Sequence, residues 1–366
     1  MRKNQTDSLI YLFRVHVILT MVGLIIFSLT SNAKVNPFTS TSLDINNRRI
    51  INVAVLLYSF DDLFMMQLKQ NLQDIQNQNK DKVNFTFYDG KNNIAVQYQT
   101  LDLLLKSDID LFILNLADAK ESILNDFILK VKPKEAPIII LEAFPTTISE
   151  ISKYYDKATF VGPANTKRAG IEEGIILVNQ WNSNKKFIDK NGDNILQYVM
   201  LEGPANNPIS NERKKYSVST INNVGIKTEE LENSNANWSK ELAKDAINNL
   251  FLRYDGRIEE IIANNDAMAI GSIEALQRYG YNTGDKSKYV SVVGIDGISE
   301  ARDLVDKGIM TGTVIQDSKL LAEGLYNVGM NVVNKEDPIA NTNYTVVDGL
   351  IEIPMKYEKY EKNMVN

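Results

Sequence analysis

Short apolar runs alternate with amphipathic segments along most of the chain. Residues 137–141 are apolar at every position, which is typical of a parallel strand that helices cover on both faces. Apolar residues at helical spacing predict helices at residues 62–78, 167–181, 239–252 and 266–279. Strands are predicted at residues 51–57, 83–87, 110–116, 137–141, 158–161, 196–201, 259–263, 290–295 and 311–315.

This alternation of strands and helices predicts an α/β fold with doubly wound parallel sheets. The chain has 366 residues, which is long for one domain and sufficient for two lobes that each bury a core. The pattern runs through two sets of elements, and Val161, Gly162 and Pro163 mark a boundary between them. We therefore expect two lobes.

The N-terminus has the three parts of an export signal. Basic residues precede an apolar run at residues 17–29, and Ser31 and Ala33 follow it at the spacing of a cleavage site. This apolar run is shorter than the roughly 20 residues that span a bilayer. It becomes long enough if it is extended back to Leu9, so two interpretations stay open for residues 1–33: a signal peptide or a membrane anchor.

Residues 34–49 are rich in Ser, Thr and Asn, which predicts a flexible leader to the fold. With either interpretation of residues 1–33, the protein is expected to be exported. It would then lie in the periplasm or on the outer face of the cytoplasmic membrane.

The composition excludes several classes of protein. The chain has no cysteine, and its one histidine, His16, lies in the N-terminal apolar segment. Disulfides, thiolate metal sites, a cysteine nucleophile and a thioether-linked lipid anchor are therefore excluded, and the body has no histidine for acid–base catalysis. Without these side chains we expect no enzyme. The net charge is -6 and no long basic run occurs, so no nucleic-acid partner is expected.

Polar and aromatic residues follow the ends of the predicted strands, where doubly wound sheets bind their ligands. They occur at residues 58–64, Asn115, Glu142, residues 264–266, Asp296 and Gln316. This set holds carboxylates, amides and aromatic rings, without a nucleophile–base pair or a glycine-rich phosphate loop. Such groups suit a polyol, because hydroxyls need donors and acceptors and the apolar faces of a sugar stack on rings.

Residues 189–197 have the spacing of an EF-hand calcium loop. Oxygen-bearing side chains occupy positions 1, 3, 5 and 9, and the Ile195 carbonyl is available at position 7. The sixth position is Asn194 in place of Gly, and the twelfth is Met200 in place of a bidentate Glu. The loop alone is therefore also compatible with a polar turn that binds no metal. The oxygen-bearing side chains are those of Asp189, Asn191, Asp193 and Gln197.

Several of these segments together resemble the bacterial galactose/glucose-binding proteins of sugar ABC transport and chemotaxis. The resemblance covers residues 51–357, nearly the whole chain after the leader. The segments that carry it are YSFDDLFM at 58–65, YDKATFVG at 155–162, DKNGDNILQ at 189–197, GIKTE at 225–229, IANNDAM at 262–268, VGID at 293–296 and GTVIQD at 312–317.

The resemblance implies a type I periplasmic-binding fold, in which three crossing segments join two doubly wound lobes. The crossings would lie near residues 161–164, 316–318 and 352–355. The first lobe would comprise residues 50–161 and 318–351, and the second residues 163–316 and 353–366. In this family a Glu from a later strand completes the calcium shell, and the matching residue is Glu259. The resemblance thus implies a structural calcium ion.

The sugar site of this family matches in part. Its stacking aromatics fall on Phe64 and Trp238, and Tyr58 matches at the cleft wall. Its hydroxyl-binding residues fall on Asp62, Arg213, Asn265 and Asp296. Four positions depart from the family: Glu142 and Gln316 replace Asn, Asn207 replaces His, and Ile209 replaces Asp. Because the Ile209 side chain accepts no hydrogen bond, a hydroxyl buried against it would lose about 1–3 kcal/mol.

We therefore expect a protein that closes around a galactose- or glucose-like monosaccharide and delivers it to an ABC permease, and that is monomeric when free. Three other interpretations stay open. The protein could be a membrane-anchored sensor that signals to a histidine kinase or chemoreceptor, it could bind a different aldose, or its pocket could have drifted to weak affinity. A carboxylate pair of the glycosidase kind, Glu142 with Asp62, is a weaker alternative.

Overall fold

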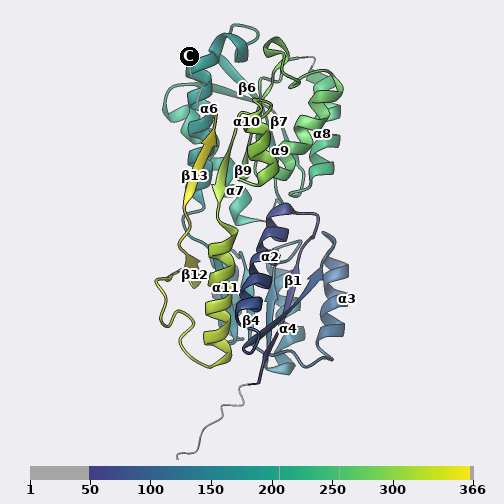
Figure 1. Cartoon of the computed structure of the whole chain (residues 1–366), viewed down its shortest axis with the longest axis vertical. Helices are drawn as coiled ribbons and strands as arrows, with labels where there is room; N and C mark the ends of the chain where they lie inside the picture. Colours follow the sequence, from purple (N-terminus) through teal and green to yellow (C-terminus); the bar gives the residue numbers. More distant parts are fainter. Residues whose placement is uncertain (1–48, 206, 255, 363–366) are drawn as a thin grey trace, which may run out of the picture. The chain divides into compact units, whose positions relative to one another are not determined.

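Strands and helices alternate from Ile51 onward and build two lobes, each around its own sheet (Figure 1). The computed structural model describes residues 49–205, 207–254 and 256–362. The predicted export segment and all but the last residue of the predicted leader lie outside this part of the chain. Within the described residues, no helix is both long and apolar enough to cross a membrane.

The first lobe is built on a sheet that has, among the described residues, seven strands in the order β11-β12-β5-β4-β3-β1-β2. Neighbouring strands are parallel except β11 and β12. The strands are β1 (Ile51–Leu57), β2 (Val83–Asp89), β3 (Leu111–Leu114), β4 (Ile138–Leu141), β5 (Ala158–Pro163), β11 (Thr345–Val347) and β12 (Leu350–Ile353). The helices are α2 (Leu63–Gln78), α3 (Ile94–Leu104), α4 (Glu121–Val131), η1 (Lys132–Lys134), α5 (Pro145–Ser152) and α11 (Ser318–Val333).

Strand β1 is apolar at every position from Val53 to Leu57. Val53 and Val55 pack in one core with α2 and α11, whereas Ala54 and Leu56 pack in a second core with α3, α4 and α5. Helices cover both faces of the sheet, so neither of the two alternating sets of side chains faces solvent. Both sets are therefore apolar.

The second lobe is built on a sheet that has, in the described part of the chain, six strands in the order β13-β10-β9-β8-β6-β7. Only β13 runs antiparallel to its neighbour. The strands are β6 (Ile195–Glu202), β7 (Lys227–Asn235), β8 (Glu260–Ala263), β9 (Ser291–Asp296), β10 (Gly312–Gln316) and β13 (Tyr357–Glu361). The helices are α6 (Lys167–Ile188), α7 (Pro208–Asn223), α8 (Lys240–Tyr254), α9 (Asp266–Arg278), η2 (Lys286–Lys288) and α10 (Ser299–Asp306).

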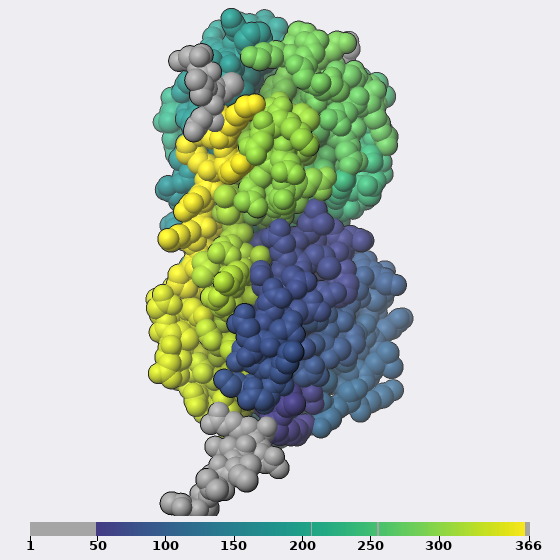
Figure 2. All heavy atoms as spheres, viewed as in Figure 1, coloured from purple at the N-terminus to yellow at the C-terminus, as the bar shows by residue number. Residues whose placement is uncertain are grey.

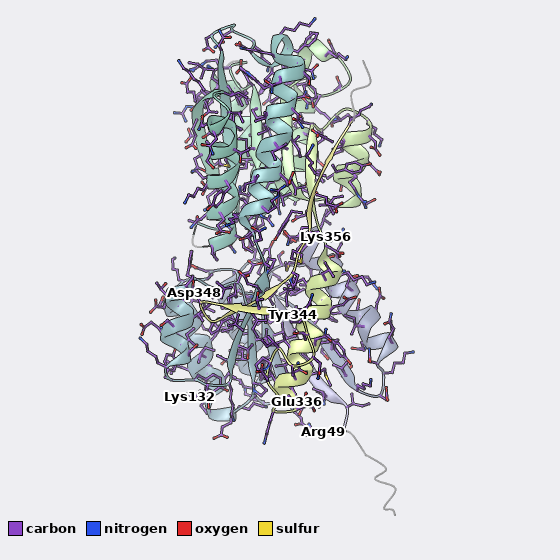
Figure 3. The ribbon with its side chains drawn as sticks, turned by 90° about the vertical axis from the view of Figure 1, so that its left-hand side faces the viewer. Arg49, Lys132, Glu336, Tyr344, Asp348 and Lys356 are labelled. Atoms are coloured by element: carbon purple, nitrogen blue, oxygen red, sulfur yellow. The ribbon has the colours of Figure 1, made fainter. Side chains whose placement is uncertain are left out.

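Three short segments carry the chain from one sheet to the other: residues 164–166 after β5, Asp317 after β10, and residues 354–356 after β12. The C-terminal part of the chain, yellow in Figure 2, extends over both lobes, and Lys356 lies on its crossing between them (Figure 3). The expected fold of two doubly wound lobes joined by three crossings is confirmed.

Four strands were not predicted from the sequence. Strand β7 has Leu231 as its one aliphatic residue and lies at the edge of its sheet, so no apolar run marks it. Strands β11, β12 and β13 are short. Figure 3 locates β11 in the first lobe, between the labelled residues Tyr344 and Asp348. Helix α6 is longer than predicted and runs to Ile188, with a non-helical residue at Asn184.

Candidate ligand-binding cleft

The carboxyl ends of strands from both sheets meet around one cleft. It encloses about 590 Å³ of space free of atoms, part of it open to solvent. The structure brings all ten predicted ligand-binding residues to this cleft. They are Tyr58, Asp62, Phe64, Glu142, Asn207, Arg213, Trp238, Asn265, Asp296 and Gln316. Met65, Asn115, Leu116, Ala117, Ala119, Pro204 and Ile209 also line it.

Asp62 is fixed at the start of α2. Its Oδ1 accepts a hydrogen bond from the Met65 amide at 2.8 Å, which caps the helix, and the Tyr58 hydroxyl donates to its Oδ2. Burial raises the pKa of the Asp62 carboxyl, and these two hydrogen bonds oppose the shift. Phe64 follows two residues later, and it packs in the core of the first lobe while lining the cleft.

Glu142 and Asn115 form the wall that the neighbouring strands β3 and β4 contribute. Glu142 follows β4 directly and adopts a left-handed backbone, with φ of 60°. Asn115 follows β3, and its backbone carbonyl accepts a hydrogen bond from Gln97 Nε2 at 2.9 Å. The Asn115 side-chain Oδ1 is buried and has no hydrogen-bond partner among the described residues. The rule that ligands bind at strand ends identified Asn115, whereas the family resemblance did not.

Arg213 on α7 is the cationic residue of the cleft. Its Nη1 donates to the Asn264 carbonyl at 2.6 Å, and its Nη2 donates to Gln316 Oε1 at 2.5 Å. Asp296 Oδ1 lies 3.8 Å from Nη1, which is a loose ion pair. Nε is buried without a partner in the described part of the chain. The guanidinium is thus held in place with its Nε–H donor unused.

Trp238 lies between the two lobes. Its ring packs against apolar residues of both cores, and the Arg213 guanidinium lies 5.6 Å from its centroid. The ring also rests on Gly203 so closely that a Cβ atom at that position would overlap it. Gly203 therefore makes room for the indole in the cleft.

Hydrogen bonds connect the two lobes across the cleft. Asn207 Nδ2 in the second lobe donates to Glu142 Oε2 in the first lobe at 3.1 Å. Asn265 Nδ2 approaches Asp62 Oδ2 at 3.5 Å, at the limit of a hydrogen bond. Both asparagines also cap helices, because their Oδ1 atoms accept from the Ser210 and Met268 amides. The caps orient the amide groups towards the first lobe.

Carboxylates dominate the electrostatics of the site. Burial raises the pKa of Glu142, and it raises that of Asp296 well above the usual range; Arg213 opposes both shifts. Behind Asp296, Asp266 accepts hydrogen bonds from the Thr313 hydroxyl and the Ile298 amide, and burial raises its pKa to about 6. Asp296 adopts φ of 138°, which a residue with a side chain rarely does and which aims a functional group at some energetic cost.

The predicted metal loop forms a hydrogen-bonded group with Glu259. The Glu259 carboxylate accepts from the Lys190 amide at 2.7 Å and from the Gln197 amide at 3.0 Å. Asp193 accepts at Oδ2 from the side-chain amides of Asn191 and Gln197, at 2.9 and 2.8 Å. All six predicted ligand residues, which include Asp189 and Ile195, thus belong to one loop and the strand start beside it.

One carboxylate oxygen in this loop is available to bind a cation. Asp189 Oδ1 is buried without a hydrogen-bond partner in the part of the chain described, although it is an acceptor that needs one. Turning the Asn191 or Gln197 amide would present oxygen where nitrogen now faces Asp193. Nevertheless, the described residues contain no group of three or more His, Cys, Asp or Glu side chains close enough to share one ion. Amide and carbonyl oxygens would have to complete the shell.

A profile of the periplasmic binding protein domain matches residues 53–337. The chain belongs to the periplasmic binding protein family. The chain is 28% identical to the D-galactose/methyl-galactoside binding periplasmic protein MglB of Haemophilus influenzae over 316 residues. These residues cover 86% of this chain and 90% of that protein. The D-allose-binding periplasmic protein of Escherichia coli is 33% identical over 131 residues, or 36% of this chain and 40% of that one.

Solved structures of this family share the fold. An ABC transporter solute-binding protein of Bacillus halodurans with bound myo-inositol superposes with a TM-score of 0.65 at 21% identity, over 85% of this chain and 95% of that one. One from Actinobacillus succinogenes with bound D-allose gives 0.64 at 19% identity, over 84% and 97%. The type I periplasmic-binding fold and a binding protein without catalysis, both expected from the sequence, are confirmed.

Proposed function

We propose that this protein is the exported sugar-binding subunit of an ABC transporter, with a galactose- or glucose-like monosaccharide as its ligand. The observation that carries the proposal is the composition of the cleft, which combines carboxylates, amides, one guanidinium and three aromatic residues from both lobes. Such a set offers donors and acceptors to hydroxyls and apolar faces to the ring. The similarity to a D-galactose/methyl-galactoside binding protein over most of both chains supports the sugar class.

The proposed mechanism is closure of the two lobes. Asp62, Phe64 and Glu142 belong to the first lobe, whereas Arg213 and Asp296 belong to the second. A ligand that contacts both sets binds the closed form more tightly and shifts the population towards it. The three crossing segments would act as the hinge, and the closed shape is what a permease would recognise.

Calorimetric titration with D-galactose, D-glucose, D-xylose and L-arabinose tests the proposal. We expect saturable binding of at least one of them, which Arg213→Lys would weaken because lysine cannot reproduce the planar fork of donors. Arg168→Lys is a matched control, since Arg168 lies on α6 outside the cleft and pairs with Glu172. Failure of all four sugars to bind would refute a neutral galactose- or glucose-like ligand.

One sequence feature favours an alternative function as a membrane-anchored sensor. The chain has no cysteine that could carry a lipid, so an uncleaved N-terminal segment would be the remaining anchor if the protein stays on a membrane. A sensor that signals to a histidine kinase or chemoreceptor would use the same closed form. The mass of the native N-terminus discriminates the two interpretations, because a chain that begins at Lys34 carries no anchor. We expect the free protein to be monomeric in both cases.

We also propose that residues 189–197 and Glu259 bind a structural calcium ion. The ligands would be Asp189, Asn191, Asp193, Gln197 and Glu259, with the Ile195 carbonyl. The buried, unpartnered Asp189 Oδ1 supports this assignment. A bound cation would balance the three carboxylates and fix the loop that enters β6. The loop residues do not line the cleft, so the ion would not touch the sugar.

A further inference from the structure

The cleft is lined by more acidic than basic side chains. Asp62, Glu142 and Asp296 line it, and Arg213 is the one cationic side chain among the described residues that line it. Among the described residues that line the cleft, one ion pair has its nitrogen and oxygen within 4.0 Å of each other. It joins Arg213 Nη1 to Asp296 Oδ1 at 3.8 Å. Among the described residues Glu142 therefore has no cationic group within 4.0 Å, and Arg213 acts on it from a longer distance.

The groups that remain available around Glu142 are acceptors. One Glu142 oxygen accepts from Asn207, and the other makes no hydrogen bond to a described residue. Asn115, which is 6% exposed, lies on the neighbouring strand end with its Oδ1 unpartnered. The other cleft amides have their oxygens occupied: Asn207 and Asn265 cap helices, and Gln316 accepts from Arg213. The wall made by the first lobe thus needs hydrogen-bond donors and positive charge.

We propose that the ligand is an amino sugar or a similar amino-substituted polyol, and that Glu142 and Asn115 bind its protonated amino group. This inference rests on the proposed function, because it assigns the chemistry of the ligand in the same cleft. An ammonium group brings three donors and one positive charge, which matches a carboxylate beside an amide oxygen. A neutral hydroxyl would satisfy one acceptor and bring no charge to stabilise the carboxylate form of Glu142.

The protonation of Glu142 should depend on the charge of the ligand. Burial in the cleft raises the pKa of Glu142, so the carboxyl tends to hold a proton in the absence of a cationic partner. Binding of an ammonium would displace that proton, whereas binding of a neutral sugar would not. Proton release is therefore a readout that depends on the charge of the ligand rather than on its size.

The test compares D-galactosamine with D-galactose and D-glucosamine with D-glucose by calorimetry at mildly acidic pH, where the amines are protonated. We expect at least one amino sugar to bind about tenfold or more tightly than its parent, the scale of one charge-assisted hydrogen bond. Its N-acetyl derivative, which is neutral, should lose this advantage. Titration in buffers of different ionisation enthalpy should show proton release for the amino sugar alone.

Glu142→Gln tests the assignment, and Glu150→Gln, an exposed carboxylate on α5 of the same lobe, is the matched control. The ratio of amino-sugar to parent-sugar affinity should approach one in the Glu142 variant and stay unchanged in the control. A preference that survives Glu142→Gln would overturn the role of this residue. Amino sugars that bind no more tightly than their parents would overturn the inference but leave sugar binding intact. No binding of either kind would refute the proposed function itself.

Discussion

Asn207 Nδ2 donates a hydrogen bond to Glu142 Oε2 at 3.1 Å and thereby connects the second lobe to the first across the cleft. The same asparagine caps α7 through its Oδ1, which accepts from the Ser210 amide at 3.0 Å. One side chain thus fixes a helix start and bridges the two lobes. The bridge ends on Glu142, the residue that we assign to the ligand.

Asn207→Asp should open the ligand-free protein. The aspartate keeps an oxygen for the helix cap, but it loses the donor and places a second carboxylate opposite Glu142. We expect this change to destabilise the closed form by about 1–3 kcal/mol. We expect a larger radius of gyration by small-angle X-ray scattering and about tenfold weaker ligand binding. Asn93→Asp, which changes the exposed cap of α3 in the same way, is the control. Equal scattering from both variants would contradict the bridge.

Gly203→Ala should displace Trp238 from the cleft. A Cβ atom at Gly203 would overlap the indole, so the ring must move, which costs typically about 1–3 kcal/mol in a well-packed site. Ligand affinity should fall together with the melting temperature. Gly162→Ala is the control, because its Cβ would meet no atom closer than 3.5 Å. A Gly203 variant with unchanged affinity would show that the position of Trp238 does not matter for binding.

Removal of calcium should destabilise the protein. A chelator should lower the melting temperature and added calcium should restore it, since an ion at 100 times its dissociation constant stabilises by about 2.7 kcal/mol. Asp189→Asn should remove the response to calcium. Asp285→Asn is the control, because Asp285 forms a similar polar turn outside the loop by accepting from Ser287. An unchanged melting temperature with chelator would refute the calcium site.

Glu173 should make stability depend on pH. It is fully buried on α6, and it faces Arg213, Ser217, Asp266 and Glu260. Burial raises its pKa well above the usual value, and Arg213 opposes the shift. The stability contributed by the protonated form is therefore complete below the unfolded-state pKa and is lost as the pH rises through the folded-state pKa.

Glu173→Gln, which mimics the protonated carboxyl, tests this dependence by urea unfolding at several pH values. The variant should gain stability over the wild type at neutral and alkaline pH, and the gain should shrink as the pH falls towards the ordinary pKa of a glutamate. Glu241→Gln, an exposed carboxylate on α8, should show no such trend. A gain that is the same at every pH would mean that Glu173 does not titrate in this range.

The sequence allowed the framework of the fold to be predicted because the central strands carry their own signal. Strand β1 has the predicted bounds, since residues covered on both faces must all be apolar. Strand β7 was missed because an exposed edge strand has no such requirement, and Lys227–Asn235 is mostly polar. The signal for a strand therefore depends on how deeply the sheet buries it.

The cleft residues were predictable as a set, but their pairing was not. The strand-end rule and the family resemblance together identified Glu142 and Asn207 as site residues. Their hydrogen bond joins residues 65 positions apart on different lobes, and it depends on how the three crossing segments orient those lobes. No local sequence pattern indicates that Asn115 Oδ1 is buried without a hydrogen-bond partner among the described residues.

Trp238 allows the most direct test that a sugar binds in this cleft. The chain has two tryptophans, and Trp181 is buried in the core of the second lobe, so Trp181→Phe would leave Trp238 as the single reporter. On titration with each aldose and amino sugar, we expect a saturable change in Trp238 fluorescence with the affinity that calorimetry gives for the same ligand. A ligand that binds by calorimetry without changing this fluorescence would contradict the assignment of the cleft.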